Sequence, residues 1–198
     1  MIALLTGPPG IGKSSVARQL IDRNPDVVEV ISFGQLLHLA VERRLATSIN
    51  YAEFRSSAAS VVTRSDFEEA TIELAKNKTA SDPSKWLVVD SHAVAREEFG
   101  WQANPDIPGT LQQYAYNVII LLDAPSQVVL KRIRKRPGGR LIKTKRDVEI
   151  LSALQRGIAT YYSGTIGSPL WVIDAKPSIN SVVVAVESVL ALRVYGPS

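Results

Sequence analysis

Residues 7–14 read Gly7-Pro8-Pro9-Gly10-Ile11-Gly12-Lys13-Ser14 and fit the phosphate-binding loop pattern G-x-x-x-x-G-K-[ST] at every fixed position. The preceding run, Ile2–Thr6, is short and nearly all apolar, which is typical of a strand buried on both faces of a parallel sheet. After the loop, Val16, Leu20 and Ile21 share one helical face. The loop is therefore predicted to lie between a strand and a helix, which is the context that this motif requires.

This loop predicts a nucleotide site. Its backbone N–H groups would wrap a phosphate at the N-terminus of the helix, where the helix dipole favours negative charge. Lys13 would reach the outer phosphates, and the Ser14 hydroxyl would ligate Mg²⁺. The alternative is a glycine turn with an incidental Lys-Ser pair. We expect Mg²⁺ and ATP, with the ATP bound by Gly7, Pro8, Pro9, Gly10, Ile11, Gly12, Lys13, Ser14 and Ser15.

Length and composition favour one compact domain over residues 1–198, because the chain is 45% hydrophobic and short for two independent cores. No apolar run approaches the roughly 20 residues of a membrane span. Met1-Ile2-Ala3 leads straight into the first predicted strand without a charged leader, so we expect a soluble cytoplasmic protein with no membrane contact. The absence of cysteine excludes disulfides, thiolate metal sites and cysteine nucleophiles.

The positive charge is concentrated in one segment. The chain has 23 Lys and Arg against 19 Asp and Glu, a formal net charge of +4. Nine of the basic residues lie between Lys131 and Arg146, a stretch without any acidic residue, so the remainder carries 14 basic against 19 acidic side chains. The basic character is therefore one local feature and not a property of the whole surface.

Strands and helices alternate along the chain. Each strand is followed by helical sequence, which predicts a five-stranded parallel sheet covered on both faces, a P-loop kinase-like three-layer α/β/α fold. Two excursions are expected: a helical insertion at about 33–80 and a short basic lid at about 132–146. Residues 96–110, rich in Gly and Pro, predict a long loop. The four strands after the first are expected at 27–31, 86–90, 118–123 and 170–174.

Two features suggest further ligands at the carboxyl edge of this sheet, where open α/β sheets bind them. Asp90 ends the third strand and could hold Mg²⁺ opposite Ser14, with a turn or helix-cap aspartate as the alternative. The helical insertion could grip a second ligand, although a solvated helix face is the alternative for any single arginine there. The arginines available are Arg43, Arg44, Arg55 and Arg64.

Three further motifs resemble those of the archaeal-type adenylate kinases, within the nucleoside monophosphate kinases. Ile31-Ser32-Phe33-Gly34 resembles the family's I-[NS]-[YF]-G element, and Asn50–Arg55 is similar to its stretch ending in E-x-R. Asp90-Ser91-His92-Ala93-Val94-Ala95-Arg96 resembles D-T-H-A-V-x-R and is followed by Pro108-Gly109. The D-x-H element is also similar to that of eukaryotic nuclear adenylate kinase-like ATPases. The resemblance spans nearly the whole chain.

The resemblance implies Mg²⁺-dependent transfer of the ATP γ-phosphoryl group to a nucleoside monophosphate, with AMP giving ADP, and a homotrimer. It places Ser14 and Asp90 at the metal. Arg132 matches the arginine that opens the family's lid, but Pro137-Gly138-Gly139 and the run of Lys and Arg replace the family's lid sequence. The acceptor would be bound by Gly34, Arg55, His92 and Arg96. The catalytic residues would be Lys13 and an arginine among Arg132, Arg136 and Arg140; Arg156 lies near another phosphate-binding position.

Two other functions remain open on the sequence. One is a P-loop ATPase that binds RNA with its basic segment as a switch, although this segment lacks the interleaved aromatic side chains of a base-stacking surface. The other is a small-molecule kinase with a different acceptor. The pocket of the helical insertion decides between acceptors, and the sequence does not specify it.

Overall fold

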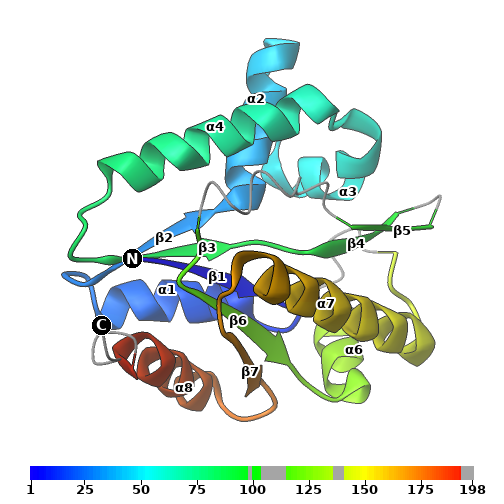
Figure 1. Ribbon diagram of the computed structural model, residues 1–198. Coiled ribbons are helices and arrows are strands. Elements are labelled where there is room, and N and C mark those ends of the chain that lie inside the picture. Colours follow the sequence, from blue (N-terminus) through cyan, green and yellow to red (C-terminus); the bar gives the residue numbers. More distant parts are fainter. Residues whose placement is uncertain (98–99, 104–114, 136–140, 193–198) are drawn as a thin grey trace.

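A five-stranded parallel sheet forms the centre of the protein (Figure 1). The computed structural model describes residues 1–97, 100–103, 115–135 and 141–192. The strand order is β2-β3-β1-β6-β7, which confirms the predicted P-loop kinase-like α/β/α fold and its five strands. The strands are β1 (Ile2–Thr6), β2 (Val28–Ser32), β3 (Trp86–Asp90), β6 (Val118–Asp123) and β7 (Leu170–Asp174).

Helices cover both faces of the sheet. On one face, α1 (Lys13–Arg23) packs against α8 (Ile179–Leu192), and on the other α7 (Lys145–Ile166) lies across β6 and β7 (Figure 1). A shorter helix, α6 (Ser126–Lys135), follows β6 and contacts α7. Between β2 and β3 the chain forms three helices: α2 (Phe33–Leu45), α3 (Tyr51–Val61) and α4 (Arg64–Ala80). Within the described residues, no helix is long and apolar enough to cross a membrane.

The apolar strand sequences are explained by their places in the sheet. β1 and β3 are buried along their whole length, because each has a strand on both sides and helices above and below. Leu5, Val88 and Ile120 are completely buried. The edge strand β7 differs, since Trp171 and Val172 are exposed. The carboxyl ends of β1, β3 and β6 therefore rest on a rigid core and can position the residues that follow them.

The prediction of a long loop over residues 96–110 is wrong for residues 96–97 and 100–103, which lie in strands. Here β4 (Val94–Glu97) and β5 (Gly100–Ala103) form an antiparallel hairpin, with Val94 opposite Ala103. The strands are only four residues long, too short to give a clear alternating pattern in the sequence. Pro108-Gly109 lies outside the described residues.

The helical insertion has a small hydrophobic core of its own. Leu37, Val41, Phe54 and Ala70 are buried together in a cluster distinct from the main core, which is built around the sheet. α4 begins with a capping box, in which the Thr63 side chain accepts from the Asp66 backbone and the Asp66 carboxylate accepts from the Thr63 backbone. This arrangement fixes the start of α4 against the small core.

Asp66 also links α4 to α2. Its side chain is 1% exposed, and its carboxylate accepts hydrogen bonds from Arg44 Nε at 2.9 and 3.1 Å. Burial alone would raise the pKa of Asp66, but the hydrogen bonds from Arg44 and Thr63 outweigh it and hold the pKa below its ordinary value. Ionised Asp66 therefore stabilises the fold above its unfolded pKa, and this contribution is lost as the pH falls through the folded-state pKa.

We predict that Asp66→Asn lowers the free energy of unfolding by about 2 kcal/mol at pH 7, because Arg44 and Thr63 lose a buried anionic acceptor. The difference from the wild type should shrink as the pH falls below about 4, where the Asp66 advantage disappears. Chemical denaturation at a series of pH values measures both effects. Asp26→Asn, at an exposed position, is the control. An Asp66→Asn effect that stays constant with pH would contradict this account.

Candidate active site

The loop between β1 and α1 needs its glycines for packing as well as for backbone shape. Gly7 has φ +142°, and a Cβ there would lie 2.5 Å from the carbonyl oxygen of Leu122 in β6. Gly10 has φ +81°, and a Cβ there would lie 2.6 Å from Cγ1 of Ile133 in α6. Larger residues at these positions would strain the backbone and push β6 or α6 away. The loop is therefore fitted closely between the strand and helix beside it.

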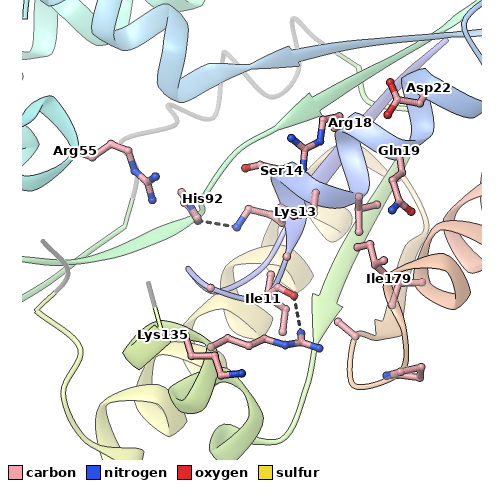
Figure 2. A pocket seen from close by; sticks show the side chains of 18 residues that line it. Ile11, Lys13, Ser14, Arg18, Gln19, Asp22, Arg55, His92, Lys135 and Ile179 are labelled. Carbon is pink, nitrogen blue, oxygen red and sulfur yellow. Dashed lines mark hydrogen bonds between the residues drawn. The ribbon is translucent and has the colours of Figure 1, made fainter. Parts of the chain in front are cut away.

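Lys13 is buried at the start of α1, with its ammonium group turned back into the loop. Lys13 Nζ donates to the carbonyl of Gly7 at 2.7 Å and lies 2.8 Å from His92 Nδ1 (Figure 2). An ammonium group has donors only, so His92 Nδ1 is the acceptor in this contact; Nδ1 also lies 3.3 Å from the carbonyl oxygen of Gly7. The turn after β3 thus makes direct contact with the phosphate-binding loop.

Ser14 and Asp90 meet where β1 and β3 end. Ser14 Oγ donates to Asp90 Oδ2 at 3.1 Å, and the Asp90 carboxylate is almost fully buried. A hydroxyl and a carboxylate are oxygen ligands of the kind that Mg²⁺ prefers. Within the part of the chain that the structure describes, no group of three or more His, Cys, Asp or Glu could hold a metal ion. A Mg²⁺ ion at Ser14 and Asp90 would therefore need further ligands, such as phosphate oxygens.

A cavity of about 880 Å³ surrounds this loop. Its wall includes residues 10–15 of the loop and α1, together with His92 after β3. Figure 2 shows Arg55 reaching from α3 towards His92, on the opposite side of Lys13 from Ile179. The far wall is mainly apolar and is formed by Ala175, Pro177, Ile179 and Val182. The volume is sufficient for a nucleotide.

Two cations of α6 close the cavity beside the loop. Arg132 donates from a terminal guanidinium nitrogen to the carbonyl of Ile11 at 2.9 Å, and Lys135 lines the same wall. Both come from the basic segment that the sequence singles out. Arg136 and Arg140, the other two predicted lid arginines, lie outside the described residues.

The arginines of the insertion divide into two groups. Arg55 lines the cavity, with its guanidinium carbon 5.9 Å from the centroid of the Tyr51 ring. The other three make ion pairs within the insertion: Arg43 with Glu69, Arg44 with Asp66, and Arg64 with Glu68. Arg55 is therefore the insertion arginine that the fold directs towards the loop.

The remaining predicted acceptor residues occupy different places. Gly34 lies near the start of α2, where a Cβ would be 3.0 Å from the Tyr51 hydroxyl, so glycine allows α2 and α3 to approach closely. Arg96 lies in β4, with its guanidinium carbon 5.1 Å from the centroid of the Trp101 ring in β5. Arg96 thus contacts the opposite strand of its own hairpin, whereas Arg55 and His92 line the cavity.

Arg156 borders a second hollow instead. It forms an ion pair with Asp123 at the end of β6, and both line a space of about 610 Å³ between the ends of β6 and β7 and α7. Its guanidinium donates to the Asp123 carboxylate there, and Arg156 is not among the residues that line the cavity at the loop.

Sequence reasoning missed the apolar far wall of the cavity and the polar residues Arg18 and Gln19 beside it. Pro177 offered a signal, because it follows the fifth strand at the carboxyl edge of the sheet, where ligands bind. The side chains of α1 gave none, since an exposed polar residue on a helix is ordinarily solvated.

The chain is similar in sequence to archaeal adenylate kinases. The adenylate kinase of Pyrococcus furiosus is 24% identical over 165 residues, covering 82% of this chain and 80% of the relative. That of Thermococcus onnurineus is 24% identical over 167 residues with the same coverage. These relatives confirm the resemblance found in the motifs.

The solved structures with a similar fold include shikimate kinases. The enzyme of Acinetobacter baumannii in complex with shikimate has a TM-score of 0.60 and 12% identity, covering 98% of this chain and 95% of its own. The shikimate kinase of Aquifex aeolicus has a TM-score of 0.55 and 14% identity, with both chains fully covered. At this identity the likeness establishes the fold.

A family model described as an AAA domain, AAA_17, matches residues 6–150. The match runs from the last residue of β1 into α7, so it includes the loop, the insertion and the turn that carries His92. Together with the relatives and the fold, it makes the protein an ATP-dependent phosphotransferase. The chain belongs to the AAA_17 family of AAA domains.

Proposed function

We propose that this enzyme transfers the γ-phosphoryl group of ATP to a nucleoside monophosphate, with AMP as the preferred acceptor. One observation carries the proposal: a single cavity joins the phosphate-binding loop to Arg55 of the insertion and to an apolar wall beside α8. Lys13 lies between Arg55 and Ile179 (Figure 2). A phosphoryl group held at Lys13 would thus have space for a nucleotide on either side.

The donor side is the half nearest α8. The loop and the N-terminus of α1 would bind the phosphates, and the wall formed by Ala175, Pro177 and Ile179 would bury the flat apolar faces of the base. Arg132 approaches the same space from α6. Its guanidinium is suited to stacking on the base or to pairing with phosphate oxygens.

The acceptor side is the half nearest α3. Arg55 would bind the single phosphate of the acceptor, because its planar guanidinium matches two phosphate oxygens at once. Phe54, in the same helix, is buried in the small core of the insertion, and Tyr51 packs against that core beside Arg55. The names of the archaeal relatives favour AMP as the acceptor.

Ser14 and Asp90 would hold Mg²⁺ on the donor phosphates. Their oxygen atoms suit this ion, and phosphate oxygens would supply the ligands that the described protein residues lack. When bound, Mg²⁺ neutralises charge on the transferring phosphoryl group.

In the proposed reaction, Lys13 exchanges its contact with the Gly7 carbonyl for phosphate oxygens. Its charge then stabilises the transferring group, as does that of Arg132 at the edge of the cavity. The acceptor hydroxyl or phosphate oxygen must be held in line with the leaving group, which is the task of Arg55. The basic segment after Arg132 would exclude the water that otherwise competes with the acceptor.

An acceptor panel tests the proposal. ADP formation would be measured with ATP and AMP, CMP, GMP, UMP or shikimate, and without acceptor, and we expect the highest kcat/KM with AMP. Equal rates with and without acceptor would instead indicate an ATPase. RNA binding that weakens steeply with salt would then favour the RNA-associated switch. ADP formation that requires shikimate and occurs with none of the four monophosphates would indicate a small-molecule kinase.

We predict that Lys13→Ala lowers kcat by about 10²-fold or more, since removing one electrostatic contact to the transition state has this effect in comparable sites. The fold should persist, because the change removes a buried charge and not a core hydrophobic residue. Lys76→Ala, which changes an exposed lysine of α4 paired with Glu73, is the control. A folded Lys13→Ala enzyme with unchanged turnover would contradict the site.

A second prediction separates donor from acceptor. Arg55→Ala should raise the KM for the monophosphate about tenfold and leave the KM for ATP unchanged, because the lost contact is to the acceptor phosphate. Arg64→Ala is the matched control, since Arg64 belongs to the same insertion but pairs with Glu68. If Arg55→Ala instead raises the KM for ATP and leaves the KM for the monophosphate unchanged, the assignment of the donor and acceptor sides is wrong.

A further inference from the structure

One polar side chain of α7 is completely buried. Gln155 is 0% exposed and lies on a stripe of α7 formed mainly by apolar residues, among them Val148, Leu151 and Ala159. Burying an amide without hydrogen bonds costs free energy, so its partners have to explain its place there.

Among the described residues, the hydrogen-bond partners of Gln155 belong to two segments at the candidate site. Its Nε2 donates to the carbonyl of Val94 at 3.0 Å, and its Oε1 accepts from the backbone N–H of Ala93 at 3.3 Å. Oε1 also lies 3.4 Å from the Thr6 hydroxyl, which donates to it. The amide thus accepts from two donors, the Ala93 N–H and the Thr6 hydroxyl, and donates to one acceptor, the Val94 carbonyl.

These two segments carry the residues in contact at the loop. Thr6 precedes Gly7, whose carbonyl binds Lys13 Nζ, and Ala93 follows His92 directly. Only three residues, 91–93, connect β3 to β4. A shift of the Ala93 backbone must therefore move His92, whose Nδ1 contacts the Lys13 ammonium.

We propose that Gln155 is a positioning residue of the phosphoryl-transfer site. It holds the turn 91–93 against the end of β1, so that His92 keeps Lys13 aligned in the loop. The inference rests on the proposed function for its catalytic consequence but not for its structural one. An apolar side chain would fill the same space without fixing the turn.

Gln155→Met tests this, because it keeps the length of the side chain and removes both polar groups. We expect kcat to fall about tenfold or more, since small misplacements of reacting groups are costly, and the KM for ATP to change by less than about twofold. Hydrogen exchange at the Ala93 amide should accelerate in the nucleotide-free protein. Ser152→Ala is the control: Ser152 lies on the same buried stripe, its Oγ has no hydrogen-bond partner among the described residues, and its replacement should change neither readout.

A double-mutant cycle distinguishes positioning from general stability. His92→Ala alone should lower kcat, and adding Gln155→Met to it should lower kcat by no more than about twofold further, because both changes act through the same contact. Effects that multiply independently would overturn the proposal, as would unchanged Ala93 exchange in Gln155→Met.

Failure of the proposed function, or of the Gln155→Met variant to fold, can be distinguished from failure of this inference. If the wild type phosphorylates no acceptor, the proposed function fails, but Ala93 exchange still tests the role of Gln155. If Gln155→Met does not fold, Gln155→Glu decides, because the buried acid, once protonated, can donate to the Val94 carbonyl and accept from Ala93 and Thr6 as the amide does. It should keep the slow Ala93 exchange and most of the turnover; fast exchange there would reject the proposal.

Discussion

A buried ammonium group holds the centre of this site together. Lys13 is almost fully removed from water, and an unpaired charge in such a place would be very unfavourable. The Gly7 carbonyl and His92 Nδ1 compensate for it, one from the loop itself and one from the turn after β3. The loop, β1 and the β3–β4 turn are therefore mutually dependent, and the surrounding core must place the ends of two strands accurately.

The sequence was sufficient for the parts of the site that one segment encodes. The loop pattern at residues 7–14 and the five apolar runs predicted the sheet, because local spacing and burial carry that information. The hairpin of β4 and β5 was not predicted, since its strands are too short to show alternation. The apolar wall at Pro177 was also missed, because it becomes part of the cavity only when α8 returns beside α1.

Gln155 illustrates the same limit from the other direction. Its position among the buried residues of α7 could be seen as a polar interruption of an apolar stripe. Its hydrogen-bond partners could not be predicted from the sequence, because Thr6 and Val94 are far from Gln155 along the chain. Only the packing of α7 on the sheet brings the three residues together. Likewise, sequence spacing alone did not separate the four arginines of the insertion, and only the family resemblance singled out Arg55. Ion pairs with Glu69, Asp66 and Glu68 engage three of them, and Arg55 lines the cavity.

The separate core of the insertion has a consequence for how such an enzyme can diversify. Leu37, Val41, Phe54 and Ala70 pack with one another, and the partly buried Phe33 and Leu36 pack against both this cluster and the main core. Mutations inside the small cluster can therefore change the position of α3, and with it that of Arg55, while the sheet and the loop keep their geometry. We expect selection for a new acceptor to accumulate its substitutions in α2, α3 and α4. Residues such as Phe33, which pack against both cores, should stay unchanged, because they connect the insertion to the sheet that carries the phosphate-binding loop.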